Sequence, residues 1–548
     1  MLHTNSPDMR QQQFFFFLMV VLGSATVHAQ TWQWAEPGAG SANADGQAIA
    51  VDAQGNSVVV GTYNSTIDFG GALLSTPGED GIFMAKFNPN GALLWSHIVA
   101  NGPGITVHGI TIDDGGAIAI VGMYQGTVAF IPGEVGTILT SAGSFDVFVA
   151  KYEQDGSPVW AHSIGGPGYD YGASICHDGY FNFFVTGDLH ETAFNLSGSK
   201  VFVTKFAYNG TEFWTNTSAE YGTAHLGDGI CADDLGNLCI TGEFFATITF
   251  GSITLDAGTP EATIYVAKLN SDGEPIWAQK AGAGGYAFGQ SVDMDAQGNA
   301  YVTGSYHGTM ALGALTLPGP GDVNLDVFVA KCASADGTFL WAIRGEGPSG
   351  DRAVGIRTDA DGTSYINGSY GLSWTIGNTT LTANGSADGF VAKLSADGAT
   401  IWAKGYGGPV SETIGDIALH GSDVFVTGGF QGSIAFDPGP TLTGQPVVRD
   451  VFVAKLEAVS TGIDAPEVTS FLLYPDPAID RVQLRGFTGS YSYTISDEQG
   501  RIVLSGAAIA EQGIAISSLA KGSYVLAMRS KDGSALQRLK FMKDQRSR

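Results

Sequence analysis

Catalytic and metal-binding side chains are scattered along this chain of 548 residues. No two histidines stand at the spacing of metal ligands, no Gly-x-Ser-x-Gly motif marks a nucleophilic serine, and no cysteine pairs with a histidine. We therefore predict no catalytic residue, no metal site and no cofactor, and expect a protein that is not an enzyme. The histidines considered are His97, His162, His225, His307 and His420.

Two acidic stretches have the composition of calcium-binding loops. They are Asp293-Met294-Asp295 and Asp359-Ala360-Asp361-Gly362. Neither is followed by a glutamate at the far end, where a calcium loop would supply its bidentate ligand. Turn formation explains both more simply, and we expect turns.

A glycan-hydrolysing alternative comes from Ser271-x-Gly273 and Ser334-x-Asp336-Gly337, which precede tryptophans. These stretches are similar to the Asp-box of sialidases, but Asp and Gly are adjacent here and Trp lies four residues beyond Gly. Sialidases also hold a carboxylate with three arginines from separate blades. The arginines of the repeat region, three of them clustered, do not fit that pattern. They are Arg344, Arg352, Arg357 and Arg449.

Lysine and tryptophan recur at a regular spacing. The lysines that close apolar-alternating runs are Lys86, Lys151, Lys205, Lys268, Lys331, Lys393 and Lys455. The tryptophans nine or ten residues later are Trp95, Trp160, Trp214, Trp277, Trp341 and Trp402. Because the pairing is repeated, we interpret it as structural, with each lysine stem packed on an indole and a cation–π attraction of roughly 0.5–1 kcal/mol.

These pairs predict a repeated unit of four antiparallel strands. The first strand ends at a turn acid such as Asp52, the second ends in Gly-x-aromatic, and the third and fourth carry the lysine and the tryptophan. Trp34 has no lysine before it and Lys455 no tryptophan after it, yet Asp52 follows Trp34 by the same 18 residues that separate other tryptophans from turn acids. We therefore predict an all-β, seven-bladed β-propeller over residues 31–456, closed by pairing of Trp34's strand with Lys455's strand.

One face of this ring is predicted to vary. The links between second and third strands differ in length, whereas nearly every other spacing is constant. These links emerge on the same face as the links between units, so ligand-binding residues are expected there. Most contain an apolar alternation such as Ile248-Thr249-Phe250-Gly251, which predicts an additional small hairpin.

The composition disfavours nucleic acid as a partner. Acidic residues outnumber basic ones by 53 to 26, giving a net charge of -27, and the excess lies in residues 31–456. Such a ring repels phosphate backbones. We interpret the surplus carboxylates as keeping an all-β surface soluble.

The first 29 residues predict a secretory signal peptide. Arg10 precedes the apolar run Phe14 to Leu22, and Val27-His28-Ala29 fits a cleavage site before Gln30. The run is too short to span a bilayer, so no transmembrane segment is expected. Because Asp8 precedes Arg10, translation starting at Met9 instead of Met1 would leave a purely basic leader.

Four cysteines do not make a disulfide framework. Cys231 and Cys239 flank the turn Asp234-Leu235-Gly236, and a three-residue bulged turn would place them opposite one another. A cross-strand disulfide is then possible in an exported protein, although small buried thiols fit the same positions. Cys176 and Cys332 are expected to be unpaired.

The pattern ends after Lys455. Residues 457–468 are predicted as a linker, and alternating runs in residues 469–548 predict a small Ig-like β-sandwich. This tail carries Tyr474, Pro475, Pro477, Gly500, Arg501, Gly522, Tyr524, Lys540 and Lys543. It resembles the type A C-terminal sorting domain of type IX secretion cargo in Bacteroidetes, with Asp476 where that family usually has Asn. The resemblance implies export by the type IX machinery, then removal of the tail and surface attachment or release.

The ring resembles SBBP-type bacterial β-propeller repeats, in which runs like Phe148-Val149-Ala150-Lys151 and a Gly-then-Trp hairpin recur. That family mostly lacks an assigned activity. We therefore expect an exported, monomeric, non-enzymatic module that binds an unidentified glycan or protein. The alternatives are a polysaccharide-active glycosidase or lyase with its site at the channel mouth, and a structural surface component. Carboxylates about 5–10 Å apart would favour hydrolysis, and exposed aromatic residues would favour binding.

Overall fold

The computed structural model describes residues 30–71, 73–130, 138–190, 198–219, 226–282, 284–319, 324–457, 472–474, 478–485, 490–497, 501–509, 513–529 and 535–543. All named elements in these ranges are β-strands. No helix in these ranges is long and apolar enough to cross a membrane. The predicted signal peptide up to Ala29 and nearly all of the predicted linker lie outside the described residues.

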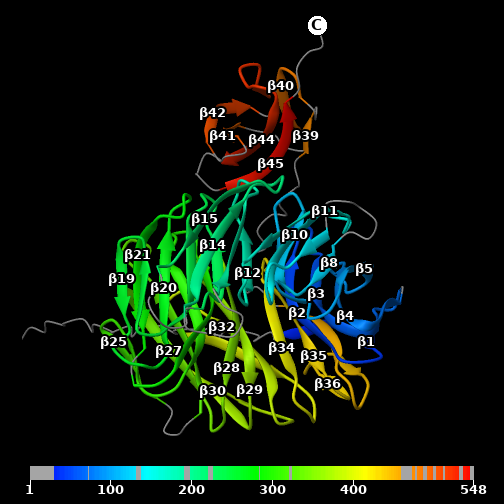
Figure 1. The fold of residues 1–548 in the computed structure, drawn as a ribbon, viewed down its shortest axis with the longest axis vertical. Helices are drawn as coiled ribbons and strands as arrows, with labels where there is room; N and C mark the ends of the chain where they lie inside the picture. Colours follow the sequence, from blue (N-terminus) through cyan, green and yellow to red (C-terminus); the bar gives the residue numbers. More distant parts are fainter. Residues whose placement is uncertain are drawn as a thin grey trace, which may run out of the picture.

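The repeat region consists of four-stranded antiparallel units arranged side by side (Figure 1). The first strands are β2 (Ala44–Val51), β6 (Thr106–Ile112), β12 (Tyr171–His177), β16 (Gly229–Ala232), β22 (Ala287–Met294), β28 (Arg352–Thr358) and β34 (Thr413–His420). The second strands are β3 (Ser57–Asp68), β7 (Ile118–Tyr124), β13 (Phe183–Leu189), β17 (Leu238–Phe244), β23 (Ala300–Tyr306), β29 (Ser364–Tyr370) and β35 (Asp423–Phe430).

The third and fourth strands complete each unit. The third strands are β4 (Leu74–Phe87), β10 (Asp146–Tyr152), β14 (Lys200–Phe206), β20 (Thr263–Leu269), β26 (Asp326–Cys332), β32 (Asp388–Leu394) and β38 (Asp450–Glu457). The fourth strands are β5 (Leu93–Asn101), β11 (Pro158–Ile164), β15 (Glu212–Thr217), β21 (Pro275–Ala281), β27 (Phe339–Glu346), β33 (Thr400–Tyr406) and, beside β38, β1 (Thr31–Gly40).

The N-terminal strand joins the two ends of the repeat region. β1 pairs antiparallel with β38, and Trp34 lies opposite Lys455. The last residues of β1 pair with the following unit, with Ala39 opposite Asp68 of β3. The predicted pairing of these two strands is therefore observed, and the all-β, propeller-like fold is confirmed.

Each repeated lysine lies opposite its tryptophan, as the spacing predicts. In one unit Lys331 lies opposite Trp341 on the fourth strand and Tyr301 on the second. The Lys331 ammonium lies 4.7 Å from the centre of the Tyr301 ring, which meets Trp341 edge-on at 6.0 Å. The predicted indole partner for the ammonium is therefore wrong. The extended lysine carries its charge past the opposed indole, so the described cation–π contacts are with Tyr or Phe rings.

Lysine and tryptophan fasten several units to the next, an arrangement we term the inter-unit latch. Trp277 Nε1 donates to Ser334 O at 3.0 Å, and Lys268 Nζ donates to Ser334 Oγ at 2.9 Å. At the junction of the chain ends, Trp34 Nε1 donates to Pro89 O at 3.0 Å, and Lys455 Nζ donates to the same oxygen at 3.5 Å. Each latch holds the third-to-fourth turn of the neighbouring unit.

The turn acids organise backbone amides, as predicted. Asp295 Oδ1 accepts hydrogen bonds from the backbone nitrogens of Gln297 at 3.0 Å and Asn299 at 2.9 Å. The Asp361 carboxylate accepts one from Thr363 N at 2.9 Å. Among the described residues no group of three or more metal-ligating side chains is placed to hold a metal ion. Asp295 and residues 359–362 lie in turns, as expected, whereas Asp293 and Met294 lie within strand β22.

The variable links contain small hairpins, as predicted. These are β8 (Thr127–Ala129) with β9 (Ile138–Thr140), β18 (Thr247–Phe250) with β19 (Ile253–Asp256), β24 (Met310–Leu312) with β25 (Leu315–Leu317), β30 (Ser373–Ile376) with β31 (Thr379–Thr382), and β36 (Ser433–Ala435) with β37 (Thr441–Thr443). β30 also pairs with the preceding unit, with Ile376 opposite Gly345. Trp374 and Ile376 are buried, so packing orders these links.

Beyond the ring, two antiparallel sheets share one core. One contains β39 (Leu472–Tyr474), β40 (Arg481–Arg485) and β43 (Ile514–Ala515), and the other β42 (Ile502–Ile509), β41 (Ser490–Ser496), β44 (Gly522–Arg529) and β45 (Ala535–Lys543). Val482, Ile495, Leu526 and Phe541 are buried in that core. This is the arrangement of a small β-sandwich.

The buried pair of Lys86 and Asp52 provides a test of the lysine's role. Their charged atoms lie 2.8 Å apart, and their side chains are 3% and 0% exposed. Lys86→Met leaves the Asp52 carboxylate buried without its cation, so we expect a loss of about 3–5 kcal/mol in the free energy of unfolding measured with urea.

Two further variants serve as controls. The exposed Lys280→Met should change the free energy of unfolding by no more than about 0.5 kcal/mol. The double variant Asp52→Asn/Lys86→Met should recover part of the loss, because no buried charge remains. Equal losses for Lys86→Met and Lys280→Met would contradict a structural role for the buried lysine.

Candidate functional site

The first strands surround a channel. Each first strand packs against the first strand of the next unit, and β34 packs against β2. Two adjoining cavities of about 440 Å³ and 360 Å³ lie among them. The larger one opens where the first strands begin, near Asp45 and Thr413. The links between units arrive at this same end of the strands. This end is therefore the variable face, on which the sequence predicts ligand binding.

One residue at or directly before each first strand lines both cavities. These waist residues are Gln47, His108, Ala173, Asp228, Gln290, Val354 and Gly415. At most of them a β-bulge interrupts the pairing with the second strand, as between Gly46 and Ala48 around Gln47. A bulge turns one side chain out of the regular alternation, which here aims it into the channel.

Sequence reasoning missed the waist residues, although the repeat contained a signal. Each waist residue lies five positions before the residue at which its first strand gives way to the turn. Gln47 lies five positions before Asp52, and His108 lies five positions before Asp113. The neighbouring positions repeat small or apolar residues except at Asp416, whereas this position holds glutamine, histidine, aspartate, valine, alanine and glycine. The residue type differs between units at this one structurally equivalent position, which indicates a role other than maintaining the repeated fold.

His108 is a neutral member of the waist. Burial lowers the pKa of its imidazole to about 4. Because the Gly172 carbonyl accepts only, Nδ1 donates to it at 2.7 Å, and Nε2 accepts from Thr106 Oγ1 at 3.0 Å. The ring stacks on Tyr171 at a centroid distance of 4.4 Å. His108 therefore presents an uncharged aromatic surface.

A group of carboxyls adjoins the waist at Asp228. The Asp228 and Glu243 carboxyls lie close enough to influence each other's pKa, and Asp228 Oδ2 is buried without a hydrogen-bond partner among the described residues. Burial, partly offset by the neighbouring Glu243, raises the pKa of Asp228 to about 6. Burial and then the charge of Asp228 raise the pKa of Glu243 well above its usual value, and the same two causes act on Asp188.

The opposite end of the channel carries a compensated set of charges. Arg357 Nη2 lies 3.1 Å and 3.0 Å from the two oxygens of Asp416. Asp293 accepts hydrogen bonds from Thr358 N at 2.7 Å and Met294 N at 2.9 Å. Burial, partly offset by Arg357, raises the pKa of Asp293 to about 6. These carboxylates already have partners within the chain.

The structure does not gather the remaining polar residues weighed from the sequence. Arg344 pairs with Glu346, Arg357 with Asp416, and Arg449 with Asp45. Each of these arginines thus has a carboxylate of its own, unlike the arginines of a sialidase. His225 lies outside the described residues.

The cysteines come from neighbouring units. Cys231 lies directly opposite Cys239, the register predicted from the turn, and both thiols are free. Cys176 and Cys231 line the smaller cavity, while Cys239 and Cys332 share a buried core with Cys231. Burial raises the pKa of all four thiols, that of Cys239 to about 12. The pairing of Cys231 with Cys239 in the exported protein stays a prediction.

Thiol labelling tests this environment. Because the thiolate is the reactive form, we expect less than one thiol per chain to react with iodoacetamide at pH 8 before unfolding. After unfolding in guanidinium without reductant, four reactive thiols indicate reduced cysteines and two indicate the Cys231–Cys239 bond. Rapid labelling of the folded protein would contradict the raised pKa values.

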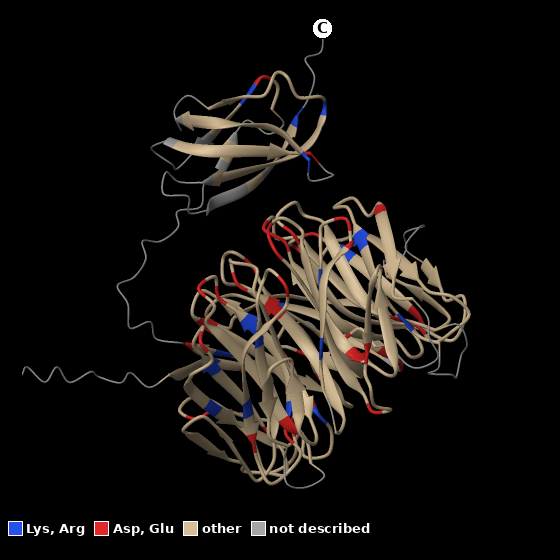
Figure 2. Ribbon diagram, turned by 90° about the vertical axis from the view of Figure 1, so that its left-hand side faces the viewer, with Lys and Arg blue, Asp and Glu red and all other residues tan. Residues whose placement is uncertain are grey.

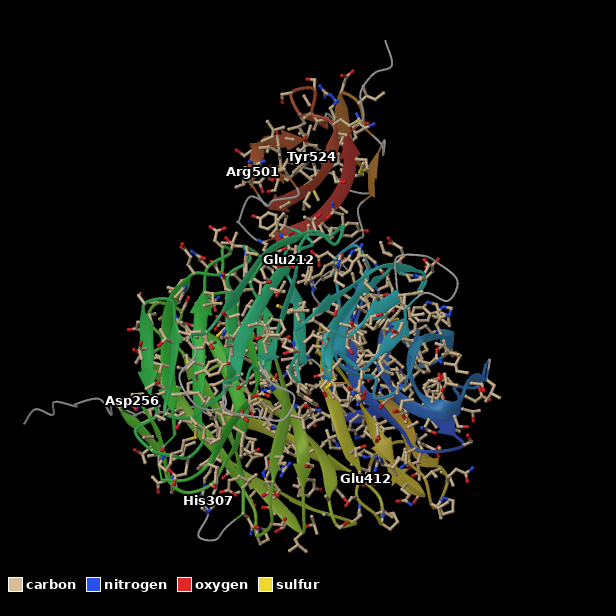
Figure 3. All side chains as sticks on the ribbon, in the orientation of Figure 1. Glu212, Asp256, His307, Glu412, Arg501 and Tyr524 are labelled. Atoms are coloured by element: carbon tan, nitrogen blue, oxygen red, sulfur yellow. The ribbon has the colours of Figure 1, made fainter. Side chains whose placement is uncertain are left out.

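Many of the ring's carboxylates serve the loops (Figure 2 shows the acidic residues, in red, in turns and at strand ends). Asp170 accepts hydrogen bonds from Gly166 N at 2.7 Å and His190 N at 2.8 Å. Glu412, labelled in Figure 3, accepts one from Gly408 N at 3.0 Å, while its Oε2 is buried without a partner among the described residues. Solubility is therefore not the only role of the surplus acids.

Glu412 should make stability depend on pH. Burial, followed by the charge of Asp388, raises its pKa to about 8. A raised carboxyl pKa favours folding at low pH, so this contribution is lost as pH rises from about 4.5 towards 8. We expect Glu412→Gln to increase the free energy of unfolding at pH 8 by about 1–3 kcal/mol and to have little effect at pH 5.

The control is Glu212→Gln, whose carboxylate is exposed on β15 (Figure 3). It should leave the pH profile of unfolding by urea unchanged. A Glu412→Gln profile parallel to that of the unaltered protein would show that Glu412 is ionised in the fold.

The tail identifies the route of the protein. Residues 472–541 match the family model of the secretion system C-terminal sorting domain. The protein is exported. The sorting domain directs it through the type IX machinery to the cell surface or the medium. Of the residues that carried the resemblance, Pro475, Pro477 and Gly500 lie outside the described residues. Tyr524 donates through its hydroxyl to Ala520 O at 3.0 Å, and Arg501 pairs with Asp497. Tyr474 and Lys540 lie in β39 and β45, Gly522 opens β44, and Lys543 closes β45.

Known proteins similar to the ring are distant. An uncharacterized WD repeat-containing protein of Acanthamoeba polyphaga mimivirus is 23% identical over 441 residues, which are 63% of this chain and 31% of that protein. The match therefore spans about a third of that relative.

Solved structures are also distant. A fungal alcohol oxidase in complex with copper is 13% identical, with 94% of this chain and 99% of that chain covered and a TM-score of 0.39. The WD40 β-propeller domain of Doa1 is 10% identical, with 62% and 93% covered and a TM-score of 0.28. These TM-scores are too low to establish a fold or an activity.

Proposed function

We propose that the repeat region is a closed, seven-bladed β-propeller of the SBBP type from a member of the Bacteroidetes. The pairing of β1 with β38 and the packing of β34 against β2 support closure. The inter-unit latch at Pro89 supports it further, because the last unit fastens the first there as other units fasten their neighbours.

We further propose that the exported propeller is a non-enzymatic, monomeric module that binds a glycan or protein ligand at the channel mouth on the variable face. The observation that carries this proposal is the divergence of the waist residues at one equivalent position of every unit. Tyr171 and His108 add a stacked aromatic surface beside that position. A purely structural surface component would have no need for such differences.

The second candidate is a polysaccharide-active enzyme with its site in the same channel. The observation in its favour is the pair Asp228 and Glu243, since carboxyls with raised pKa values can act as general acids. The proximity of these two carboxyls does not by itself place an acid and a base on opposite sides of a glycosidic bond. The divergent waist residues and the stacked aromatic surface make binding the better supported function.

A glycan array and a pull-down with the exported protein test the proposal, alongside hydrolysis assays on the same glycans. We expect a bound glycan or protein whose binding falls at least tenfold with Tyr171→Ala, and no hydrolysis. The matched control is Asp336→Asn, in an exposed turn at the other end of the strands. Hydrolysis that is lost with Asp228→Asn would favour the enzyme, and ligand binding untouched by channel variants would exclude this site.

A further inference from the structure

The pocket around Asp228 carries negative charge that no nearby cation balances among the described residues. Burial, then the charges of Asp228 and Asp188, raise the pKa of Glu243, and Asp188 pairs with the imidazole of His190 at 3.1 Å. His108 is neutral, and Arg357 is engaged by Asp416 at the far end of the channel. The pocket therefore places several buried carboxyls together without a matching cation among the described residues.

The same pocket offers aromatic and neutral acceptor surface. Burial, followed by the charges of Asp228 and Asp188, raises the pKa of the Tyr171 phenol, and Tyr171 lines the larger cavity. Tyr265 donates its hydroxyl proton to Leu226 O at 3.0 Å and so does not neutralise the acids. Gln47 Oε1 and Gln290 Oε1 are buried acceptors without a hydrogen-bond partner among the described residues.

We propose that this pocket binds the primary ammonium group of a small organic cation, with Asp228 as its counter-ion. The inference rests on the proposed function, because it names the ligand class of that same site. An ammonium supplies N–H donors to carboxylate and amide oxygens, and the face of an aromatic ring attracts it. The described side chains do not form a metal-binding group there, which leaves an organic cation as the better match.

Binding exchanges a cation for a proton. Burial raises the pKa of Asp228 to about 6 and that of Glu243 well above its usual value, which favours a proton on the carboxyls of the free protein. When the ammonium enters, the carboxyls become ionised, and the proton leaves to solvent; no covalent bond forms or breaks. Affinity should therefore rise with pH, because the carboxyls lose their proton more easily. The titratable groups that face the pair are Asp170, Asp188, Tyr169, Tyr171, His190 and Tyr265.

The test is calorimetric titration of the full exported protein with cadaverine, a primary diamine, and with the neutral 1,5-pentanediol. We expect cadaverine to bind at least tenfold more tightly at pH 8 than at pH 5, and at least tenfold more tightly than the diol. Titration in two buffers of different ionisation enthalpy should reveal proton release at pH 7. Asp228→Asn should weaken cadaverine binding at least tenfold and abolish that release.

Two further variants complete the test, one as a control and one as an alternative to Asp228→Asn. Asp293→Asn changes another channel acid, whose oxygens already bind backbone amides, and should leave cadaverine binding unchanged. If Asp228→Asn fails to fold, Glu243→Gln supplies a permanent donor to Asp228 and should still weaken binding.

Three results would overturn the inference: equal affinity for the diol, unchanged binding in Asp228→Asn, or no binding of cadaverine. If a glycan or protein found on the array is nevertheless lost with Tyr171→Ala, the proposed binding function stands and only the ligand class falls.

Discussion

The buried lysine at the end of each third strand is the interaction on which the ring depends. An ammonium taken out of water is costly unless carbonyls, carboxylates or aromatic rings surround it. Lys268 meets this requirement only because the next unit delivers Ser334 and Gly298 to it. At this lysine, stacking on the neighbouring unit and solvation of the ammonium are coupled. Lys86, Lys331 and Lys455 instead pair with Asp52, Asp295 and Asp423 of their own units, so the fold of each of those units supplies part of the solvation.

The opposite face of the ring is stabilised by different interactions. On that face the links between units pass short hairpins whose apolar residues are buried. Asp170 and Glu412 accept hydrogen bonds from backbone amides of loops, which have no partner in a sheet. Charge is used locally to hold loops in place. An acidic ring with few cations can therefore stay folded, because much of its negative charge is bound to N–H groups or held as neutral carboxyl.

The channel runs between these two faces of the ring. In six units a β-bulge in the first strand turns one side chain inward, and in the remaining unit Asp228 lies directly before β16. These side chains line the channel and lie outside the regular alternation of the strand. The polar waist residues stand in two adjacent pairs, Gln47 with His108 and Asp228 with Gln290, and smaller residues lie between the pairs, which makes the channel asymmetric although its frame repeats.

The sequence by itself determined the strand order, the turn acids, the pairing of Trp34 with Lys455, the register of Cys231 with Cys239 and the sorting domain, because periodic spacing and local turn chemistry are written in consecutive residues. Only the tertiary structure decided that lysine ammonium groups meet Tyr and Phe rings and the neighbouring turn instead of the indoles, since that depends on how far an extended side chain reaches across units. Likewise, the Asp228 and Glu243 carboxyls are buried near one another only because the start of β16 and the strand β17 bring them to one side of the channel. No spacing along the chain encodes that burial.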